Sequence, residues 1–178
     1  MLLKCIRFHN FRPFIGDQEI KLVCSKYDKT NVTVLLGDNT YGKTTFVLAF
    51  IWCLYGESRF NISDSILNKK IENSMDYDSY ETAFVEVEFE DNNRNYSMRR
   101  TQEFKKTGKG QLKAGETVAI LSYITDTGEK KRITGQDDIN VIIKSILPLD
   151  LSSFFFFEGE KNNESRRWNK RRNLKANR

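Results

Sequence analysis

The chain has 178 residues, of which 39% are hydrophobic, 12% aromatic and 30% charged, a composition that fits one folded domain and excludes a low-complexity or disordered chain. It contains no run of 18 apolar residues, so neither a membrane span nor a membrane partner is predicted. The net charge of +5 comes from residues 161–178, which hold eight of the 29 basic residues and one of the 24 acids. The rest of the chain is slightly acidic, so overall charge does not indicate a nucleic-acid-binding face.

The first 36 residues have the pattern of short strands. Leu2–Phe8 is largely apolar, a polar turn is predicted around residues 10–17, and residues 19–23 alternate with the period of two typical of a half-buried strand. Val32–Leu36 is almost wholly apolar and rich in β-branched residues, which favours an interior strand.

The three cysteines, Cys5, Cys24 and Cys53, lie far apart in apolar stretches. They have no metal-ligand spacing and form no even set for disulfides, so reduced, buried thiols are predicted. Lys4 and Arg7 interrupt the apolar N-terminus, which therefore lacks the pattern of a signal peptide. Both observations favour a cytoplasmic protein.

A helix with one apolar face is predicted from Lys43 to about Tyr55, with Gly56 as its C-terminal cap. An irregular connection or a small subdomain is predicted over residues 57–79. Residues 81–134 alternate in polarity between turn signals, which predicts an antiparallel meander. A second helix, Gln136–Leu147, is expected to end before Pro148.

The segment Gly37-Asp38-Asn39-Thr40-Tyr41-Gly42-Lys43-Thr44 fits the phosphate-binding pattern G-x-x-x-x-G-K-[ST] at every fixed position. Gly37 and Gly42 let the backbone close around a phosphate, and the backbone amides and the helix N-terminus direct positive charge towards it. Lys43 is predicted to contact the β- and γ-phosphates, and the Thr44 hydroxyl to bind Mg²⁺.

The phosphate-binding motif does not identify the class of nucleotide-binding protein. No Asn-Lys-x-Asp segment for guanine recognition follows it. A Walker B element, an apolar strand that ends in an acid, is also missing. Asp150 follows a segment that contains Pro148, and the acids near Phe89 lie on an alternating strand.

Three spaced motifs resemble the N-terminal lobe of SMC-like ATPases, the relatives of SbcC and RecF. They are Asn10-Phe11-Arg12-Pro13-Phe14, the loop at residues 37–45, and Trp52–Gly56. Over roughly residues 1–161, and most closely at Phe154–Glu160, the chain is similar to DndD, the SMC-like ATPase of bacterial DNA phosphorothioation systems. The resemblance implies an α/β P-loop NTPase fold: the N-terminal lobe of an ABC/SMC-type head over residues 1–160, with the meander as a subdomain.

The resemblance also implies roles for single residues. Asn39–Thr45 match the nucleotide-binding loop, and Arg12 matches an arginine near the phosphates. Glu158 stands where relatives often carry the glutamine of the Q-loop, which ligates Mg²⁺ and senses the γ-phosphate. Lys43 and Glu158 are therefore the candidate catalytic residues, and Thr44 and Glu158 the candidate Mg²⁺ ligands. A carboxylate can bind Mg²⁺ but cannot donate a hydrogen bond to the attacking water.

The partners that the resemblance implies are a C-terminal lobe with the signature motif and Walker B, a second head, DNA, and other proteins of a DNA-modification complex. Two heads would enclose two ATP molecules and act on DNA. On this interpretation the present chain binds MgATP and does not turn it over alone.

Two basic regions are open to interpretation. Residues 161–178 lack apolar heptads and are predicted to be a disordered tail, the start of a truncated coiled coil, or a basic arm on DNA phosphates. Lysines at residues 105–113 and the basic residues at 130–132 form a second candidate DNA-contact surface on predicted hairpins.

Three alternative functions remain open from the sequence. The first is an SbcC- or RecF-type DNA repair ATPase. The second is a module that dimerises or recruits partners on nucleotide binding without hydrolysis. The third is a self-sufficient kinase or phosphohydrolase that uses Asp150 or Glu158 as its metal-binding acid.

Overall fold

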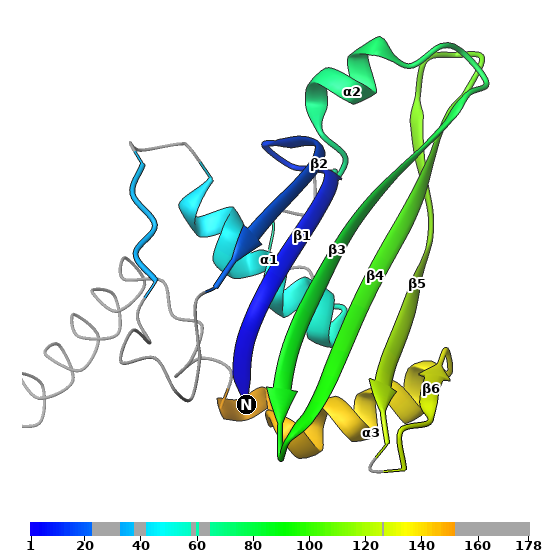
Figure 1. The fold of residues 1–178 in the computed structure, drawn as a ribbon. Helices are drawn as coiled ribbons and strands as arrows, with labels where there is room; N and C mark the ends of the chain where they lie inside the picture. The colour runs from blue at the N-terminus through cyan, green and yellow to red at the C-terminus, as the bar shows by residue number, and fades with distance from the viewer. Residues whose placement is uncertain (23–32, 38–41, 58–59, 61–64, 126, 152–178) are drawn as a thin grey trace, which may run out of the picture.

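The computed structural model describes residues 1–22, 33–37, 42–57, 60, 65–125 and 127–151. A six-stranded antiparallel sheet with the order β2-β1-β3-β4-β5-β6 carries helix α1 on one face, and helix α3 lies at one end of the strands (Figure 1). The strands are β1 (Leu2–Phe11), β2 (Phe14–Lys21), β3 (Tyr80–Asp91), β4 (Arg94–Lys106), β5 (Leu112–Ile124) and β6 (Lys130–Ile133). The helices are α1 (Lys43–Tyr55), α2 (Lys69–Ser74), α3 (Gln136–Ile146) and the short 3-10 helix η1 (Leu149–Leu151).

The predicted meander is confirmed as β3 to β6, but it has no sheet of its own. Strand β1 pairs with both β2 and β3, so the N-terminal strands and the meander form one continuous sheet. The polar turn predicted around residues 10–17 is also shorter than expected. β1 runs to Phe11 and β2 starts at Phe14, because Asn10 and Arg12 adopt positive φ angles of 46° and 53° that reverse the chain at once.

The alternation along β3 separates the two faces of the sheet, as the sequence predicts. Val85, Val87 and Phe89 are fully buried on the face that carries α1. Glu86 and Glu88 lie on the other face, where both contact Arg7 of β1. The Arg7 Nη1 to Glu88 Oε1 distance is 2.6 Å, and this hydrogen bond raises the pKa of Arg7. One face is therefore the core and the other a layer of ion pairs.

Helix α1 has the predicted bounds, and Gly56 caps it with a φ of 76° and an N–H bond to the Trp52 carbonyl. The prediction of one apolar face is wrong, because the helix is buried on nearly every side. The sheet covers one side, and Phe60, Leu67 and residues of α3 belong to the same core. The buried residues of α1 are Phe46, Leu48, Ala49, Phe50, Ile51, Trp52, Cys53 and Leu54.

The interior strand predicted for Val32–Leu36 is not formed in the part that the structure describes. Residues 33–37 have no regular secondary structure and are exposed, with Val34 and Leu36 at 69% and 91% exposure. Apolar composition indicated burial, but a strand also needs a neighbour for its N–H and C=O groups. No described strand pairs with this segment.

Two of the three predicted thiols are confirmed as free and buried, Cys5 and Cys53, while Cys24 lies outside the described residues. The Cys53 thiol is 3.3 Å from the Val85 carbonyl oxygen and 3.2 Å from that of Met98. Cys53 therefore contacts the backbone of both β3 and β4. Burial raises the pKa of Cys53 to about 12. Among the described helices, none has the length and apolarity needed to cross a membrane.

Candidate functional site

Helix α1 begins at the end of the predicted phosphate-binding loop. Gly42 is its N-cap, and the first intrahelical bond runs from the Phe46 N–H to the Gly42 carbonyl at 2.8 Å. The helix amides before Phe46 therefore have no acceptor within the helix. The first turn carries no acidic residue and no side chain caps it, so its positive dipole end suits an anion.

Gly42 meets two demands that only glycine satisfies at low cost. Its φ of 89° lies in the left-handed region. A Cβ at this position would lie 2.7 Å from the Cγ of Pro13, closer than two carbon atoms can approach. The glycine of the motif thus allows α1 to start directly against the Arg12–Pro13 turn.

Lys43 and Thr44 are exposed at the start of α1, where a bound phosphate could reach them. The Lys43 Nζ donates a hydrogen bond to the Gly37 carbonyl, 2.5 Å away, so the two ends of the predicted loop lie together. The intervening part of the motif, Asp38, Asn39, Thr40 and Tyr41, and the candidate Mg²⁺ ligand Glu158 lie outside the described residues.

Arg12 is held in a turn that is fastened to the segment before α2. Its N–H bonds to the Ile66 carbonyl at 2.8 Å, and the Asn68 N–H bonds to the Asn10 carbonyl at 2.8 Å. The Arg12 Nη1 donates to the Ser65 carbonyl at 3.2 Å. Positive φ angles at Asn10 and Arg12 cost about 1 kcal/mol or more each and persist where the surroundings impose them. Such strain is typical of functional sites.

One cavity of about 550 Å³ brings these parts together. It lies between the start of α1, the Arg12 turn and the start of α2. Its lining is Arg12, Pro13, Ile15, Gly42, Thr45, Ser65, Leu67, Asn68, Lys69 and Lys70. The predicted residues Arg12, Gly42 and Thr45 therefore share a cavity, although about 30 positions separate the turn from the loop.

Two lysines of this cavity were missed by sequence analysis. Lys69 and Lys70 come from the first turn of α2, and no motif marks them. A signal was present in Asn68, because asparagine before a helix is a common N-cap. Its Oδ1 accepts hydrogen bonds from the N–H groups of Lys70 and Ile71. Even so, nothing in the sequence relates α2 to the phosphate-binding loop.

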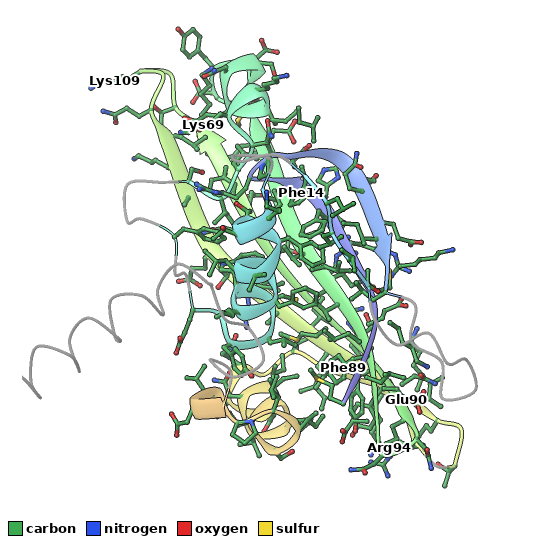
Figure 2. All side chains as sticks on the ribbon, turned by 90° about the vertical axis from the view of Figure 1, so that its left-hand side faces the viewer. Phe14, Lys69, Phe89, Glu90, Arg94 and Lys109 are labelled. Atoms are coloured by element: carbon green, nitrogen blue, oxygen red, sulfur yellow. The ribbon has the colours of Figure 1, made fainter. Side chains whose placement is uncertain are left out.

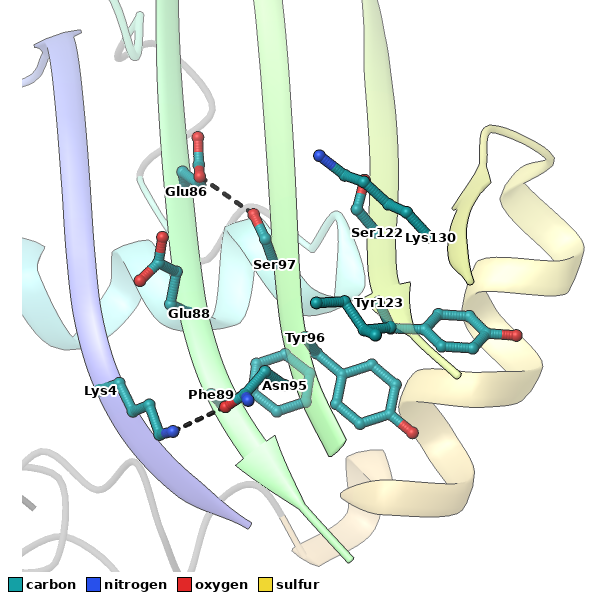
Figure 3. A pocket seen from close by; sticks show the side chains of 11 residues that line it. Lys4, Glu86, Glu88, Phe89, Asn95, Tyr96, Ser97, Ser122, Tyr123 and Lys130 are labelled. Carbon is teal, nitrogen blue, oxygen red and sulfur yellow. Dashed lines mark hydrogen bonds between the residues drawn. The ribbon is translucent and has the colours of Figure 1, made fainter. Parts of the chain in front are cut away.

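A second cavity of about 430 Å³ lies towards the other end of the sheet (Figure 3). Figure 2 shows the two ends, with Phe14, Lys69 and Lys109 at one and Phe89, Glu90 and Arg94 at the other. The polar groups of the second cavity bond to one another, as in the Lys4–Asn95 and Ser97–Glu86 hydrogen bonds of 2.6 and 3.0 Å. It contains none of the predicted site residues, so the first cavity is the candidate site.

The residues present fit a nucleotide-bound Mg²⁺ better than a metal held by protein alone. The described parts of the chain contain no group of three or more His, Cys, Asp or Glu residues that could hold a metal ion. Mg²⁺ usually takes one or two protein ligands and completes its coordination with phosphate oxygens and water. The exposed Thr44 hydroxyl at the start of α1 suits that arrangement.

The chain is similar to known proteins over nearly its whole length. Residues 5–178 match the family model AAA_23, described as an AAA domain. The chain is also similar to the "DNA double-strand break repair Rad50 ATPase" of Methanocaldococcus jannaschii, with 26% identity over 165 residues. The match covers 90% of this chain and 13% of that relative, so the chain spans only a small part of the relative's length.

Proposed function

The chain belongs to the AAA-domain family, and on that premise we propose that it is the MgATP-binding N-terminal lobe of an SMC- and Rad50-like ATPase that acts on DNA. The observation that supports this proposal most strongly is the cavity at the start of α1, which is lined by Arg12 together with Gly42 and Thr45 of the phosphate-binding motif. The similarity to a Rad50 ATPase supports the same class.

In this proposal the loop and the helix start bind the triphosphate. The amides of the first turn of α1 donate to phosphate oxygens, and Lys43 leaves the Gly37 carbonyl to contact the β- and γ-phosphates. The Thr44 hydroxyl holds Mg²⁺, which supplies charge neutralisation at the phosphates. Arg12 contributes a guanidinium whose fork suits phosphate oxygens. Asp38–Tyr41 complete the loop.

Hydrolysis is proposed to need a C-terminal lobe that carries the signature motif and Walker B. The exposed apolar segment before the loop supports this part, because Val34 and Leu36 present 69% and 91% of their surfaces to solvent. A strand from another lobe would cover these side chains and pair with their backbone. Glu158 would then ligate Mg²⁺ in the assembled head, and two heads would enclose two ATP molecules.

DNA contact is proposed at the tip of the β4–β5 hairpin. Lys109 and Lys113 are exposed there. Near this tip the hairpin is attached to the end of α2, since the Lys106 Nζ donates to the carbonyls of Glu72 and Met75. The basic residues of β6 pair with the other end of β5. At a rise of about 3.4 Å per residue, they lie about 30 Å or more from Lys113. The two basic groups are therefore separate surfaces, and residues 161–178 are a third candidate for DNA contact.

The narrower proposal is a role in DNA phosphorothioation or a linked phage defence, with the other proteins of that system as partners. It rests on the resemblance at Phe154–Glu160, which lies outside the described residues. A repair ATPase of the SbcC, RecF or Rad50 type is the second candidate, and the similarity to the Rad50 ATPase of Methanocaldococcus jannaschii favours it. Measuring phosphorothioate in the DNA of a host that lacks the gene separates them: loss supports the first, and unchanged content the second.

The central test is MgATP binding and phosphate release by the 178-residue chain. Lys43→Ala is compared with Lys144→Ala, which removes a lysine from the exposed face of α3. We expect the wild type and Lys144→Ala to bind MgATP without turnover, and Lys43→Ala to lose binding. Retained affinity in Lys43→Ala contradicts the nucleotide site, and turnover dependent on Lys43 contradicts the need for a second lobe. If the complete two-lobed protein self-associates with ATP but releases no phosphate, it is a non-hydrolysing module.

A further inference from the structure

Strand β6 forms one edge of the sheet. Among the described strands it pairs with β5 alone, and no backbone group in the described part of the chain bonds to its outer side. An edge strand presents N–H and C=O groups to which another extended chain can add as a further strand. The outer side of β6 is therefore available for pairing.

The backbone groups on this outer side belong to Lys130 and Arg132. Opposite residues in an antiparallel pair alternate between those that exchange backbone hydrogen bonds and those that do not. The Thr125 N–H bonds to the Glu129 carbonyl at 2.8 Å in the turn that joins β5 to β6. Two positions further along the register, the backbone of Lys131 also faces β5. The N–H and C=O groups of Lys130 and Arg132 consequently point away from β5.

The same two residues carry basic side chains on the face of the sheet opposite α1. The register places Arg132 in line with Ser122 and Glu88 on that face, and Lys130 lines the second cavity beside Ser122 (Figure 3). Both basic residues are exposed, and neither forms an ion pair with the residues that the structure describes. The Glu88 carboxylate is bonded to Arg7 instead. Each of the two residues thus offers an unpaired positive charge together with outward-facing backbone groups.

We infer that β6 is a docking edge for an extended acidic segment of a partner protein, which adds antiparallel to it as a seventh strand. Residues of that segment that lie opposite Lys130 and Arg132 project their side chains on the same face as these cations, so carboxylates at alternate positions meet both. Basic side chains on an edge disfavour an apolar strand or a second copy of β6, and favour an acidic strand. The inference goes beyond the proposed function, because it involves neither the nucleotide cavity nor DNA.

Duplex DNA satisfies this edge less well than an acidic strand does. Phosphates would contact the two cations, but phosphate oxygens only accept hydrogen bonds and leave the outward C=O groups of Lys130 and Arg132 without a donor. An acidic strand supplies N–H donors, C=O acceptors and carboxylates at the spacing of the edge. The combination of charge and backbone geometry therefore favours a protein partner.

The first test uses a fluorescent peptide, Thr-Val-Glu-Val-Glu-Val-Thr, and the 178-residue chain. Fluorescence anisotropy gives its dissociation constant and those of two N-methylated copies of equal charge. One copy is methylated at both glutamates, whose N–H groups point towards β6 when their side chains meet Lys130 and Arg132. The other is methylated at two valines, whose N–H groups point away. We expect glutamate methylation to weaken binding by about tenfold or more, and valine methylation by less than about twofold.

The second test separates the edge from overall charge. Lys130→Ser and Arg132→Ser should each weaken the peptide by about threefold, the effect of one exposed ion pair. Lys131→Ser is the matched control, because Lys131 pairs with Tyr123 and its side chain projects on the other face. It should change the affinity by less than about twofold. All three lysine and arginine positions are exposed, so the thermal unfolding midpoint should stay that of the wild type. Duplex DNA is titrated against the same variants.

Three results overturn the inference. Equal affinities of the two methylated peptides exclude backbone pairing, and equal losses in the three variants reduce the effect to overall charge. If Lys130→Ser and Arg132→Ser weaken duplex DNA but not the peptide, the edge belongs to DNA. The methylated peptides are compared on the wild-type chain, so that result stands even where a variant fails to fold. Failure of the proposed nucleotide site would change none of these measurements.

Discussion

Arg100 of β4 donates a hydrogen bond from its Nε to the carbonyl of Cys53, 3.1 Å away, at the C-terminal end of α1. Arg100 is 1% exposed, its Nη1 donates to Gln136 Oε1 at 3.1 Å, and burial lowers its pKa. The last turn of α1 has no basic residue of its own. Arg100 therefore supplies the positive charge that the helix C-terminus favours, while the other end of the same helix forms the candidate site.

Replacing Arg100 should destabilise the fold. In Arg100→Met the Cys53 carbonyl loses its side-chain donor in a buried position, so we expect the free energy of unfolding to fall by about 2 kcal/mol. Arg99→Met is the matched control, because Arg99 is on the opposite face of the same strand with its side chain 41% exposed. It should cost less than about 1 kcal/mol. Urea unfolding measures both, and equal losses would contradict the role of Arg100 at the helix end.

Gly42→Ala should damage the candidate site more than an equivalent change elsewhere. The new methyl group would meet Pro13 at 2.7 Å in a left-handed backbone conformation. Either the Arg12–Pro13 turn or the start of α1 must move, so we expect MgATP to bind at least tenfold more weakly. Gly16→Ala is the matched control. Gly16 also has a left-handed backbone conformation, with a φ of 63°, but a Cβ added there would have no atom within 4 Å. It should cost about 1 kcal/mol of stability and no affinity, and similar affinities for the two variants would refute the packing argument.

Two substitutions at Asn68 separate its two functions. Asn68→Asp keeps the acceptor for the amides of Lys70 and Ile71 but loses the donor to the Arg12 carbonyl. Asn68→Ala loses both. We expect both variants to bind MgATP more weakly, and Asn68→Ala to lose about 1 kcal/mol more stability through the missing cap. Calorimetric titration and thermal unfolding report these effects separately. Unchanged affinity in Asn68→Asp would mean that the Arg12 turn does not depend on this bond.

Cys53 should be unreactive in the folded protein. Burial raises its pKa from 9.0 to about 12, so at pH 8 iodoacetamide should modify it only after unfolding. The unfolded state releases the thiol proton near pH 9 and the folded state holds it to about pH 12. The free energy of unfolding should therefore fall as the pH rises between these values, by up to about 1.4 kcal/mol per pH unit. Cys53→Ala should reduce this slope; an unchanged slope would assign it to other groups.

Charge reversal should distinguish the two basic surfaces. In the complete protein, Lys109→Glu combined with Lys113→Glu should weaken duplex DNA binding and lower its dependence on salt concentration by about two units of slope. Lys130→Glu combined with Lys131→Glu is the matched control at the other end of β5. Electrophoretic shift titrations at several salt concentrations measure both. Equal losses in the two variants would assign the effect to overall charge.

Local patterns in the sequence were sufficient for helix α1 and the meander, but not for the strand expected at Val32–Leu36 or for helix α2. Helix α1 has the predicted bounds, because Gly42 and Gly56 adopt the left-handed conformations that start and end it. The meander and the sorting of β3 side chains between two faces follow from the period of two, which acts over neighbouring residues. The phosphate-binding motif was visible for the same reason, since its residues are contiguous.

The tertiary structure determined how those elements are arranged and which residues meet at the candidate site. It joined β1 to β3 in one sheet, buried α1 on nearly every side, and placed none of the described strands beside Val34 and Leu36. It also brought Arg12 and Lys70 to the start of α1 and Arg100 to its end. Each of these contacts joins residues about 25 or more positions apart. Such contacts depend on strand pairing and on the packing of the whole core, which no local pattern of polarity records.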